Sequence, residues 1–381
     1  TINGWTISSD TGCVFIALEG LVKAHALFRR TTEQALIDEL FEAFCQLDLL
    51  GISAQLHASL TATRQFLCYN QLVPRPELLA RARQVYAWFR KQAMTANYAN
   101  YNWFNRPTWT EPCAIVDALI VALQLWRATG EAHYLDDAHH IYYNALGYAQ
   151  KPHGGFGLEN CAGAHDPAAA GDDDPGVLYN KTYDVPWCCN MRGAVGLAEV
   201  ARHAFLQDAP DVEGRICLPF FFNAAAEFTL DSGCLRLSET TDYPSSGQVQ
   251  LAIDACPTTQ PIRFRLYLPG WANSHTAGVL LNGQPVTCTT DAGFTHFNTE
   301  LHAGDVIDYR FDIVERREPL PTPADEAAHA TLRHGPLIIG HADSGEWQPL
   351  NNVIDLDELT ARTDRRRIVF PAEQLLLRVQ H

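Results

Sequence analysis

The feature that most constrains the fold is a change in the spacing of apolar residues near residues 207–213. Before this point apolar residues recur every three or four positions, as they do in amphipathic helices. After it they alternate with polar residues, as in strands that bury one face. A chain of 381 residues is long enough for two cores. We therefore predict a helical domain over residues 1–210 and a β domain over residues 211–381.

The first domain contains seven segments with helical spacing. They are Val14–Arg29, Thr32–Leu50, Ser53–Gln71, Arg75–Gln92, Pro112–Ala128, Glu131–Leu146 and Gly193–Phe205. Short connections between helices favour antiparallel neighbours, so the segments form a run of helical hairpins. Such a run predicts an α/α toroid or a helical solenoid, and no strict sequence repeat distinguishes the two.

The second domain shows short strands separated by turns. Residues 262–268 and 306–311 alternate between apolar and polar, and Asn282-Gly283 is a strong hairpin signal. Many short strands with turns between them predict an antiparallel β-sandwich.

Composition and charge exclude several classes of partner. Acidic residues number 44 against 28 lysines and arginines, for a net charge of −16. Nucleic acids and anionic membranes need a basic surface, so neither is expected as a partner. A neutral ligand fits better than a phosphorylated one.

The start of the chain, Thr1-Ile2-Asn3-Gly4, is neither a signal peptide nor an initiator Met. No run of about 18 apolar residues occurs, so no membrane span is expected. A cytoplasmic location is favoured over secretion, because chemistry at a reduced thiolate suits a reducing compartment.

Four residues have the chemistry of a metal site. Cys188 and Cys189 are adjacent on a predicted loop before a helix, and Glu111 and Cys113 lie at the start of an earlier helix. Three sulfurs and one carboxylate make a four-coordinate set of the kind that Zn²⁺ prefers over Mg²⁺ or Ca²⁺. We expect these four residues to share one zinc ion. The eleven cysteines are otherwise scattered, and each isolated one is interpreted as a small buried apolar residue.

A second Glu-x-Cys competes for this assignment. Glu159-Asn160-Cys161 lies nearer to the cysteine pair, but glycines surround it and predict a flexible loop. Metal ligands are better held on rigid elements, so Glu111 and Cys113 are preferred.

Two long loops interrupt the helices and are interpreted as active-site loops. Residues 94–110 are rich in Asn, Tyr and Trp, and residues 154–186 are rich in Gly, Ala and Asp. Sugars bind through aromatic faces with amide groups nearby, so the first loop predicts a carbohydrate ligand. Its candidate ligand-binding residues are Tyr101, Trp103 and Asn105. A packing role for these aromatic residues is the alternative.

Several motifs carry a resemblance to a known family. In the helical domain they are Trp109-Thr110-Glu111-Pro112-Cys113-Ala114, Trp126-Arg127-Ala128-Thr129-Gly130, Tyr142-Tyr143-Asn144-Ala145 and Cys188-Cys189-Asn190. In the β domain they are Glu239-Thr240-Thr241-Asp242-Tyr243-Pro244, Leu268-Pro269-Gly270-Trp271-Ala272, Asn282-Gly283, Ala303-Gly304-Asp305 and His334-Gly335-Pro336-Leu337. Together they resemble glycoside hydrolase family 127, the zinc-dependent β-L-arabinofuranosidases, over roughly residues 50–345.

The resemblance implies the function of the site. Glu111, Cys113, Cys188 and Cys189 would bind Zn²⁺, and Cys188 would be the nucleophile of a retaining hydrolysis. Zinc keeps a thiolate deprotonated at neutral pH, which makes such a nucleophile chemically reasonable. Glu111 would tune the metal, and His57 resembles a histidine of that family's sugar pocket. A structural role is the alternative for a single helical histidine.

Two features depart from the family pattern. Its proton donor is a glutamate shortly before the Glu-x-Cys, yet residues 90–110 contain no Asp or Glu, and Thr95 stands at the corresponding position. Glu159, followed by Asp184, is the predicted replacement. The helical part is also shorter than that family's closed toroid. Either the chain is part of a longer protein or a partner subunit completes the toroid, so a homo-oligomer is possible.

Two other functions fit the predicted fold. Helical toroids joined to β domains also occur in polysaccharide lyases and sugar epimerases, although the acidic charge and the paired cysteines argue against these enzymes. A non-catalytic carbohydrate-binding protein with a structural zinc would explain the missing proton donor.

Overall fold

The computed structural model describes residues 12–95, 97–106, 110–150, 154–157, 187–207, 215–230, 232–257, 261–319, 330–339 and 376–379. The chain divides into two compact units between Leu197 and Ala198. The predicted domain boundary at residue 210 lies outside the described residues and stays a prediction.

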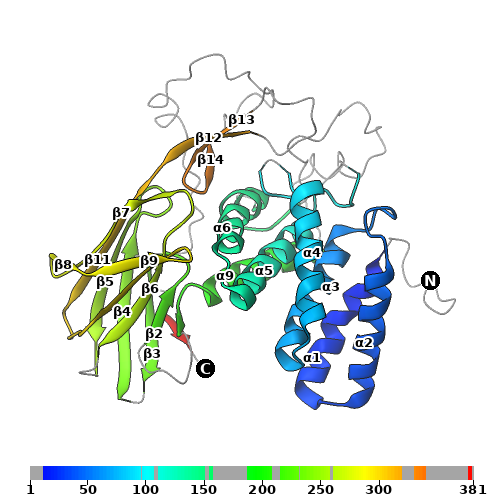
Figure 1. Cartoon of the computed structure of the whole chain (residues 1–381), viewed down its shortest axis with the longest axis horizontal. Coiled ribbons are helices and arrows are strands. Elements are labelled where there is room, and N and C mark those ends of the chain that lie inside the picture. The colour runs from blue at the N-terminus through cyan, green and yellow to red at the C-terminus, as the bar shows by residue number, and fades with distance from the viewer. Residues whose placement is uncertain are drawn as a thin grey trace. The chain divides into compact units, whose positions relative to one another are not determined.

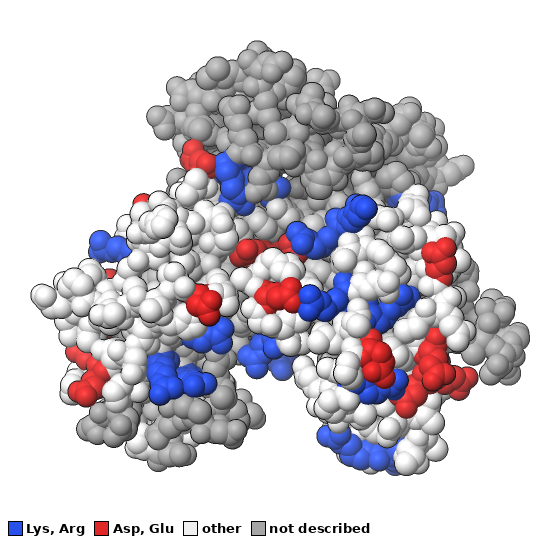
Figure 2. All heavy atoms as spheres, in the orientation of Figure 1, with Lys and Arg blue, Asp and Glu red and all other residues white. Residues whose placement is uncertain are grey.

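The first unit is helical, as predicted (Figure 1). Its elements are a 3₁₀ turn (Cys13–Ala17), α1 (Leu18–Phe28), α2 (Thr31–Gln46), α3 (Leu56–Leu72), α4 (Pro76–Gln92), α5 (Pro112–Thr129), α6 (Ala132–His140), a π-helical turn (Ile141–Leu146), α7 (Gly147–Ala149) and α9 (Trp187–Arg202). Acidic and basic side chains both occur on the face of these helices seen in Figure 2.

Helix α5 lies in the core of this unit. Pro112 begins it, where the missing amide hydrogen costs nothing, and Gly130 ends it with a positive φ of 74°. By length and hydropathy α5 could cross a membrane, which differs from the expectation for this chain. However, 78% of it is buried inside the structure, as in a core helix.

Helix α9 begins earlier than predicted. The sequence places Cys188 and Cys189 on a loop, with the helix from Gly193; the helix in fact starts at Trp187, so both cysteines lie in its first turn. The predicted start was therefore six residues too late. A Cβ at Gly193 would overlap the Phe156 ring, and one at Gly196 would lie 2.8 Å from Val116. The glycines allow close packing of the helix.

The second unit consists of strands, again as predicted. They are β1 (Leu206–Gln207), β2 (Arg215–Leu218), β3 (Ala224–Leu230), β4 (Gly233–Thr241), β5 (Gln248–Ala255), β6 (Ile262–Tyr267), β7 (Ala272–Leu281), β8 (Gln284–Val286), β9 (Cys288–Asp291), β10 (Phe294–Thr299), β11 (Val306–Ile313), β12 (Glu315–Pro319), β13 (Ala330–His334), β14 (Leu337–Ile339) and β15 (Leu376–Val379).

The strands form three sheets. Their strand orders are β1-β2-β6-β10-β9, β15-β3-β4-β5-β11-β7-β8 and β12-β13-β14. Most neighbours are antiparallel, but β2 pairs with β6 and β15 with β3 in parallel, which the prediction of an antiparallel fold missed. Asn282-Gly283 forms the predicted hairpin turn between β7 and β8, with positive φ at both residues.

Side chains of the two larger sheets meet inside this unit. The Tyr309 hydroxyl of β11 contacts Thr295 of β10 at 3.0 Å and donates to the Tyr267 carbonyl oxygen of β6 at 3.2 Å. Since all three residues are fully buried, these bonds tie the sheets together in a dry core.

Candidate metal centre

The predicted metal ligands come together in the helical unit. One ligand atom from each of Glu111, Cys113, Cys188 and Cys189 lies within 4.8 Å of all the others. Glu111 is the residue before α5 and Cys113 lies in its first turn, while the cysteine pair lies in the first turn of α9. The two helix starts therefore meet although Cys113 and Cys189 are 76 positions apart in the sequence.

The spacing of the sulfurs fits a tetrahedral metal. The Cys113 and Cys189 sulfurs are 3.8 Å apart, and those of Cys188 and Cys189 are 3.9 Å apart. A disulfide needs about 2.0 Å, so the cysteines are free. Around a tetrahedral Zn²⁺ with bonds of about 2.3 Å, neighbouring sulfurs would be separated by about 3.8 Å. The donor set and its spacing thus suit one thiophilic ion.

The four ligands differ in exposure. Cys113 and Cys189 are each 1% exposed and Glu111 is 8% exposed, whereas Cys188 is open to solvent. An external molecule can therefore reach the sulfur of Cys188 and not those of the other two cysteines.

The electrostatics of the cluster favour a cation. A hydrogen bond to Cys189 raises the pKa of the Cys113 thiol, with burial adding to the effect, and the same bond lowers the pKa of Cys189. Burial, together with the negative charges of Cys189 and Glu111, raises the pKa of Cys188. Three thiolates and a carboxylate repel one another, so a cation in their midst would take the place of the protons.

A contact from the segment 154–157 holds the start of α9. The backbone N–H of Phe156 donates to the side-chain oxygen of Asn190 at 3.3 Å, and the Phe156 ring packs on Gly193. The segment 154–157 is thereby fixed beside the cysteine pair. Anions are stabilised at helix N-termini, so the first turns of α5 and α9 are suitable positions for thiolates.

A buried ion pair lies beside the cluster. Asp117 of α5 has no exposed surface, and its Oδ2 is 2.6 Å from His57 Nδ1 and accepts a hydrogen bond from Thr61 at 2.7 Å. Burial alone would raise the pKa of Asp117, but the charges of His57 and Arg64 outweigh it and lower that pKa to about 2. For His57 burial lowers the pKa, while Asp117 raises it more, so the net shift is upward.

Two arginines extend this pair into a network. Arg64 of α3 lies 3.5 Å from the second oxygen of Asp117 and donates to Glu19 of α1 at 2.8 Å. Arg192 of α9 donates to the same Glu19 oxygen at 2.6 Å. Burial opposes ionisation of Glu19, but Lys23 and the two arginines lower its pKa to about 2. Helices α1, α3, α5 and α9 are thus joined by buried charges.

The sequence missed Asp117 and Arg192, although both leave a signal. Asp117 is the one acidic residue in the apolar helix 112–129, four positions after Cys113. Arg192 follows Cys188 by the same four positions. Residues four apart share a helix face, so two of the four predicted ligands, Cys113 and Cys188, have a charged residue one turn behind them.

The predicted sugar-binding residues of the first loop do not join the cluster in any described contact. Asn105 is exposed and donates to the Leu50 carbonyl oxygen at 2.8 Å, and the guanidinium of Arg106 lies 4.3 Å from the Trp103 ring centre. The backbone N–H of Tyr101 donates to Ala93 at 2.9 Å. Their role in ligand binding stays a prediction.

The predicted proton donors Glu159 and Asp184 and the rival ligand Cys161 lie outside the described residues. Thr95 is 3% exposed, and its hydroxyl donates to the Asn97 side-chain oxygen at 2.6 Å. This residue therefore cannot supply the proton of the family's glutamate, since a hydroxyl of this kind is not acidic at neutral pH.

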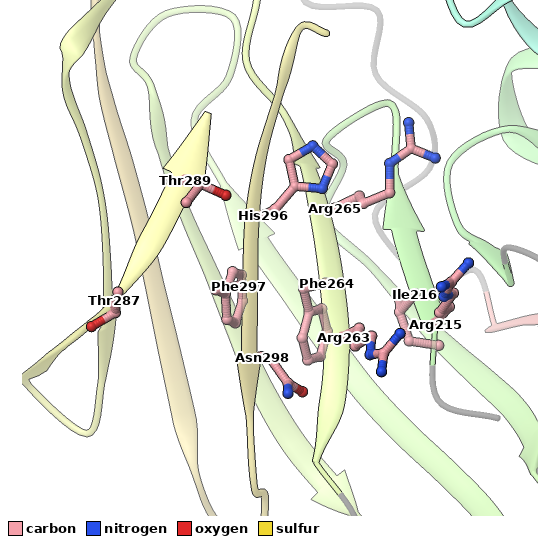
Figure 3. Close-up of a pocket in the computed structure, with 10 residues that line it drawn as sticks. All are labelled: Arg215, Ile216, Arg263, Phe264, Arg265, Thr287, Thr289, His296, Phe297 and Asn298. Carbon is pink, nitrogen blue, oxygen red and sulfur yellow. The ribbon is translucent and has the colours of Figure 1, made fainter. Parts of the chain in front are cut away.

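A groove of about 520 Å³ lies on the five-stranded sheet of the other unit (Figure 3). Its polar lining comes from residues of β2, β6, β9 and β10 and the segment before β9: Arg215, Arg263, Arg265, Thr287, Thr289, His296 and Asn298. None of the predicted site residues lines it.

Comparison with known proteins identifies part of the chain. Residues 215–313 match the family model described as β-L-arabinofuranosidase, GH127 middle domain. No curated protein matches the chain.

Solved structures share the fold of the chain. One is a GH127 β-L-arabinofuranosidase from Geobacillus stearothermophilus T6, with 15% sequence identity and a TM-score of 0.65; the alignment covers 84% of this chain and 57% of that one. A protein described as a glycoside hydrolase gives 16% identity, a TM-score of 0.67 and coverages of 84% and 59%. A further GH127 β-arabinofuranosidase has 15% sequence identity and a TM-score of 0.61. Its alignment covers 84% of this chain and 55% of that one.

The chain thus spans less than three-fifths of the length of each of these structures. The family-model match over residues 215–313 and the fold shared over 84% of the chain support the resemblance that the motifs indicated: residues 215–313 match the middle domain of glycoside hydrolase family 127.

Proposed function

We propose that this protein is a zinc-dependent retaining glycoside hydrolase whose nucleophile is the thiolate of Cys188. The substrate is a β-L-arabinofuranoside or a related glycan sugar, bound by a toroid-type helical domain that is followed by a β-sandwich. The observation that carries the proposal is the cluster of three sulfurs and one carboxylate within 4.8 Å, with Cys188 as its exposed member.

A Zn²⁺ ion bound by Glu111, Cys113, Cys188 and Cys189 would hold the sulfur of Cys188 in its nucleophilic thiolate form at neutral pH. The two buried cysteines and Glu111 fix the position of that sulfur at the start of α9. The thiolate attacks the anomeric carbon, and water then releases the sugar with retained configuration.

The remaining site residues have supporting roles in this proposal. His57, Tyr101, Trp103 and Asn105 bind the sugar through hydrogen bonds and aromatic contact. The sequence predicts Glu159, with Asp184 second, as the proton donor. Both lie outside the residues that the structure describes.

The test combines metal analysis with two variants of the nucleophile. We expect one zinc ion per chain and turnover of an aryl β-L-arabinofuranoside with retention, observed by nuclear magnetic resonance of the first product. Cys188→Ala and Cys188→Ser should each lower kcat by at least about 10³-fold, because removing a nucleophile removes the covalent route. Cys45→Ala, which removes another exposed thiol from α2, is the matched control and should keep full activity.

A structural zinc site is the second candidate, because a metal with four protein ligands and no open position is usually structural. In that case the protein would hold zinc and bind a glycan without turning it over. Wild-type turnover that is unaffected in both Cys188 variants would disprove the thiolate mechanism.

A further inference from the structure

The proposed reaction lacks an identified proton donor among the described residues. The bond to the leaving group breaks most easily when its oxygen receives a proton, and residues 90–110 contain no carboxylic acid. A side chain that lies beside the nucleophile and carries a transferable proton could fill this role.

The positions of His57 and Asp117 meet the geometric requirement. Asp117 follows Cys113 by one turn of α5, and Arg192 follows Cys188 by one turn of α9, so the charged network lies one helical turn, about 5.4 Å, behind the metal ligands. His57 contacts this network through Nδ1, which is 2.6 Å from Asp117. Its other ring nitrogen, Nε2, makes no hydrogen bond among the described contacts, and the side chain is 13% exposed.

Charges from every neighbouring helix act on His57. The carboxylates of Asp117 and Glu111, both at α5, favour its protonated form, while Arg192 of α9 and burial oppose it. Arg64 of its own helix and Glu19 of α1 are paired with each other. The nearest of these groups is Asp117, whose fully buried charge needs a cation beside it.

We infer that His57 is the proton donor of the reaction and that Asp117 is its positioning residue. The inference rests on the proposed function. As the Cys188 sulfur bonds to the anomeric carbon and the bond from that carbon to the leaving oxygen breaks, the proton on His57 Nε2 passes to that oxygen. Water then attacks the same carbon, the carbon–sulfur bond breaks, and a water proton returns to His57, which regenerates both groups.

The experiment compares two substrates that differ in their need for a proton. p-Nitrophenyl β-L-arabinofuranoside has a leaving group that departs unprotonated, whereas the methyl glycoside has one that requires protonation. His57→Gln should lower kcat/KM for the methyl glycoside by about 10²- to 10⁴-fold. For the nitrophenyl glycoside the loss should stay below about 10-fold, because acid catalysis contributes little to that bond cleavage.

Two further variants separate a chemical role from a structural one. Asp117→Asn keeps the size of the side chain and should lower kcat/KM less than His57→Gln does. The decrease should again be larger for the methyl glycoside than for the nitrophenyl glycoside. His25→Gln replaces another buried histidine of the helical unit, whose Nδ1 contacts a backbone oxygen, and should change neither substrate. Zinc content measured on each variant shows that the cluster is intact.

The possible outcomes lead to different conclusions. If His57→Gln lowers kcat/KM equally for both substrates, the inference is overturned and the proposed function stands. The same holds if Glu159→Gln, and not His57→Gln, lowers kcat/KM selectively for the methyl glycoside. A wild-type protein without turnover of either glycoside would overturn both.

Discussion

Two buried carboxyl groups, Asp117 in the helical unit and Glu239 in the β unit, have opposite surroundings. Asp117 in the helical unit has no exposed surface but touches His57, Thr61 and Arg64, and its pKa is lowered to about 2. Glu239 on β4 is 3% exposed and accepts one hydrogen bond, from the Phe222 N–H at 3.2 Å. Burial raises the pKa of Glu239 well above its ordinary value.

The difference shows that burial alone does not decide the charge of an acid. Without a cation, a buried carboxyl stays protonated, because ionisation in an apolar surrounding is costly. A buried carboxyl group that has cations beside it, as Asp117 has His57 and Arg64, stays ionised. The surroundings of Asp117 therefore favour a charged group, whereas those of Glu239 favour a neutral acid.

Removing a metal from the helical unit should give the largest effect. Ligands that are charged in the bound state repel one another without the ion, so a chelator should lower the stability of this unit by on the order of 5 to 10 kcal/mol. Amide hydrogen exchange would show the loss of protection in α5 and α9, with β4 and β5 unchanged. Equal protection of α5 and α9 with and without the chelator would contradict a metal centre.

Replacing Asp117 with alanine should have the second-largest effect on stability. Asp117→Ala leaves His57 without its nearest counter-charge and removes one of the two carboxylates beside Arg64, so the free energy of unfolding should fall by about 3 to 5 kcal/mol in urea denaturation. Glu77→Ala is the matched control, because Glu77 pairs with Arg75 at the surface of the same unit and its loss should leave the free energy of unfolding nearly unchanged.

The effect of Asp117→Ala should depend on pH with a predictable sign. The lowered pKa of Asp117 contributes stability above its unfolded value of about 3.9, and this is lost as the pH falls through about 2. The raised pKa of His57 contributes stability below about 6.5, which is lost as the pH rises through the folded value. The variant should therefore differ most from the wild type between about pH 4 and pH 6.5. A difference independent of pH would show that the pair is not ionic.

Replacing Glu239 with glutamine should have the smallest effect on stability, and the effect should be a gain. Glu239 keeps its proton in the folded protein but loses it in the unfolded chain above about pH 4.3, so wild-type stability falls as the pH rises past that value. Glu239→Gln removes this penalty, while its buried amide adds a smaller cost of its own. The net result should be a gain of about 1 kcal/mol in the free energy of unfolding at pH 7. Parallel stability curves for the two proteins from pH 4 to pH 8 would show that Glu239 is ionised.

Much of the fold follows from local patterns. The spacing of apolar residues predicted the helices, and alternation together with Asn282-Gly283 predicted the strands and their hairpin. Where prediction failed, a distant contact was responsible. The start of α9 was predicted six residues too late, and the residues that pack on its glycines, Phe156 and Val116, are far away in the sequence. The parallel pairing of β2 with β6 likewise has no local signal.

By itself the sequence determined which residues are the candidates for a metal centre: Glu111 and Cys113 beside a proline that starts a helix, and the two adjacent cysteines 188 and 189. The tertiary structure alone decided that the four ligand atoms lie within 4.8 Å and that Asp117 holds His57 beside them. The physical reason is that metal binding and ion pairing depend on distance in space, while residue type and local spacing fix only the helix on which each group sits.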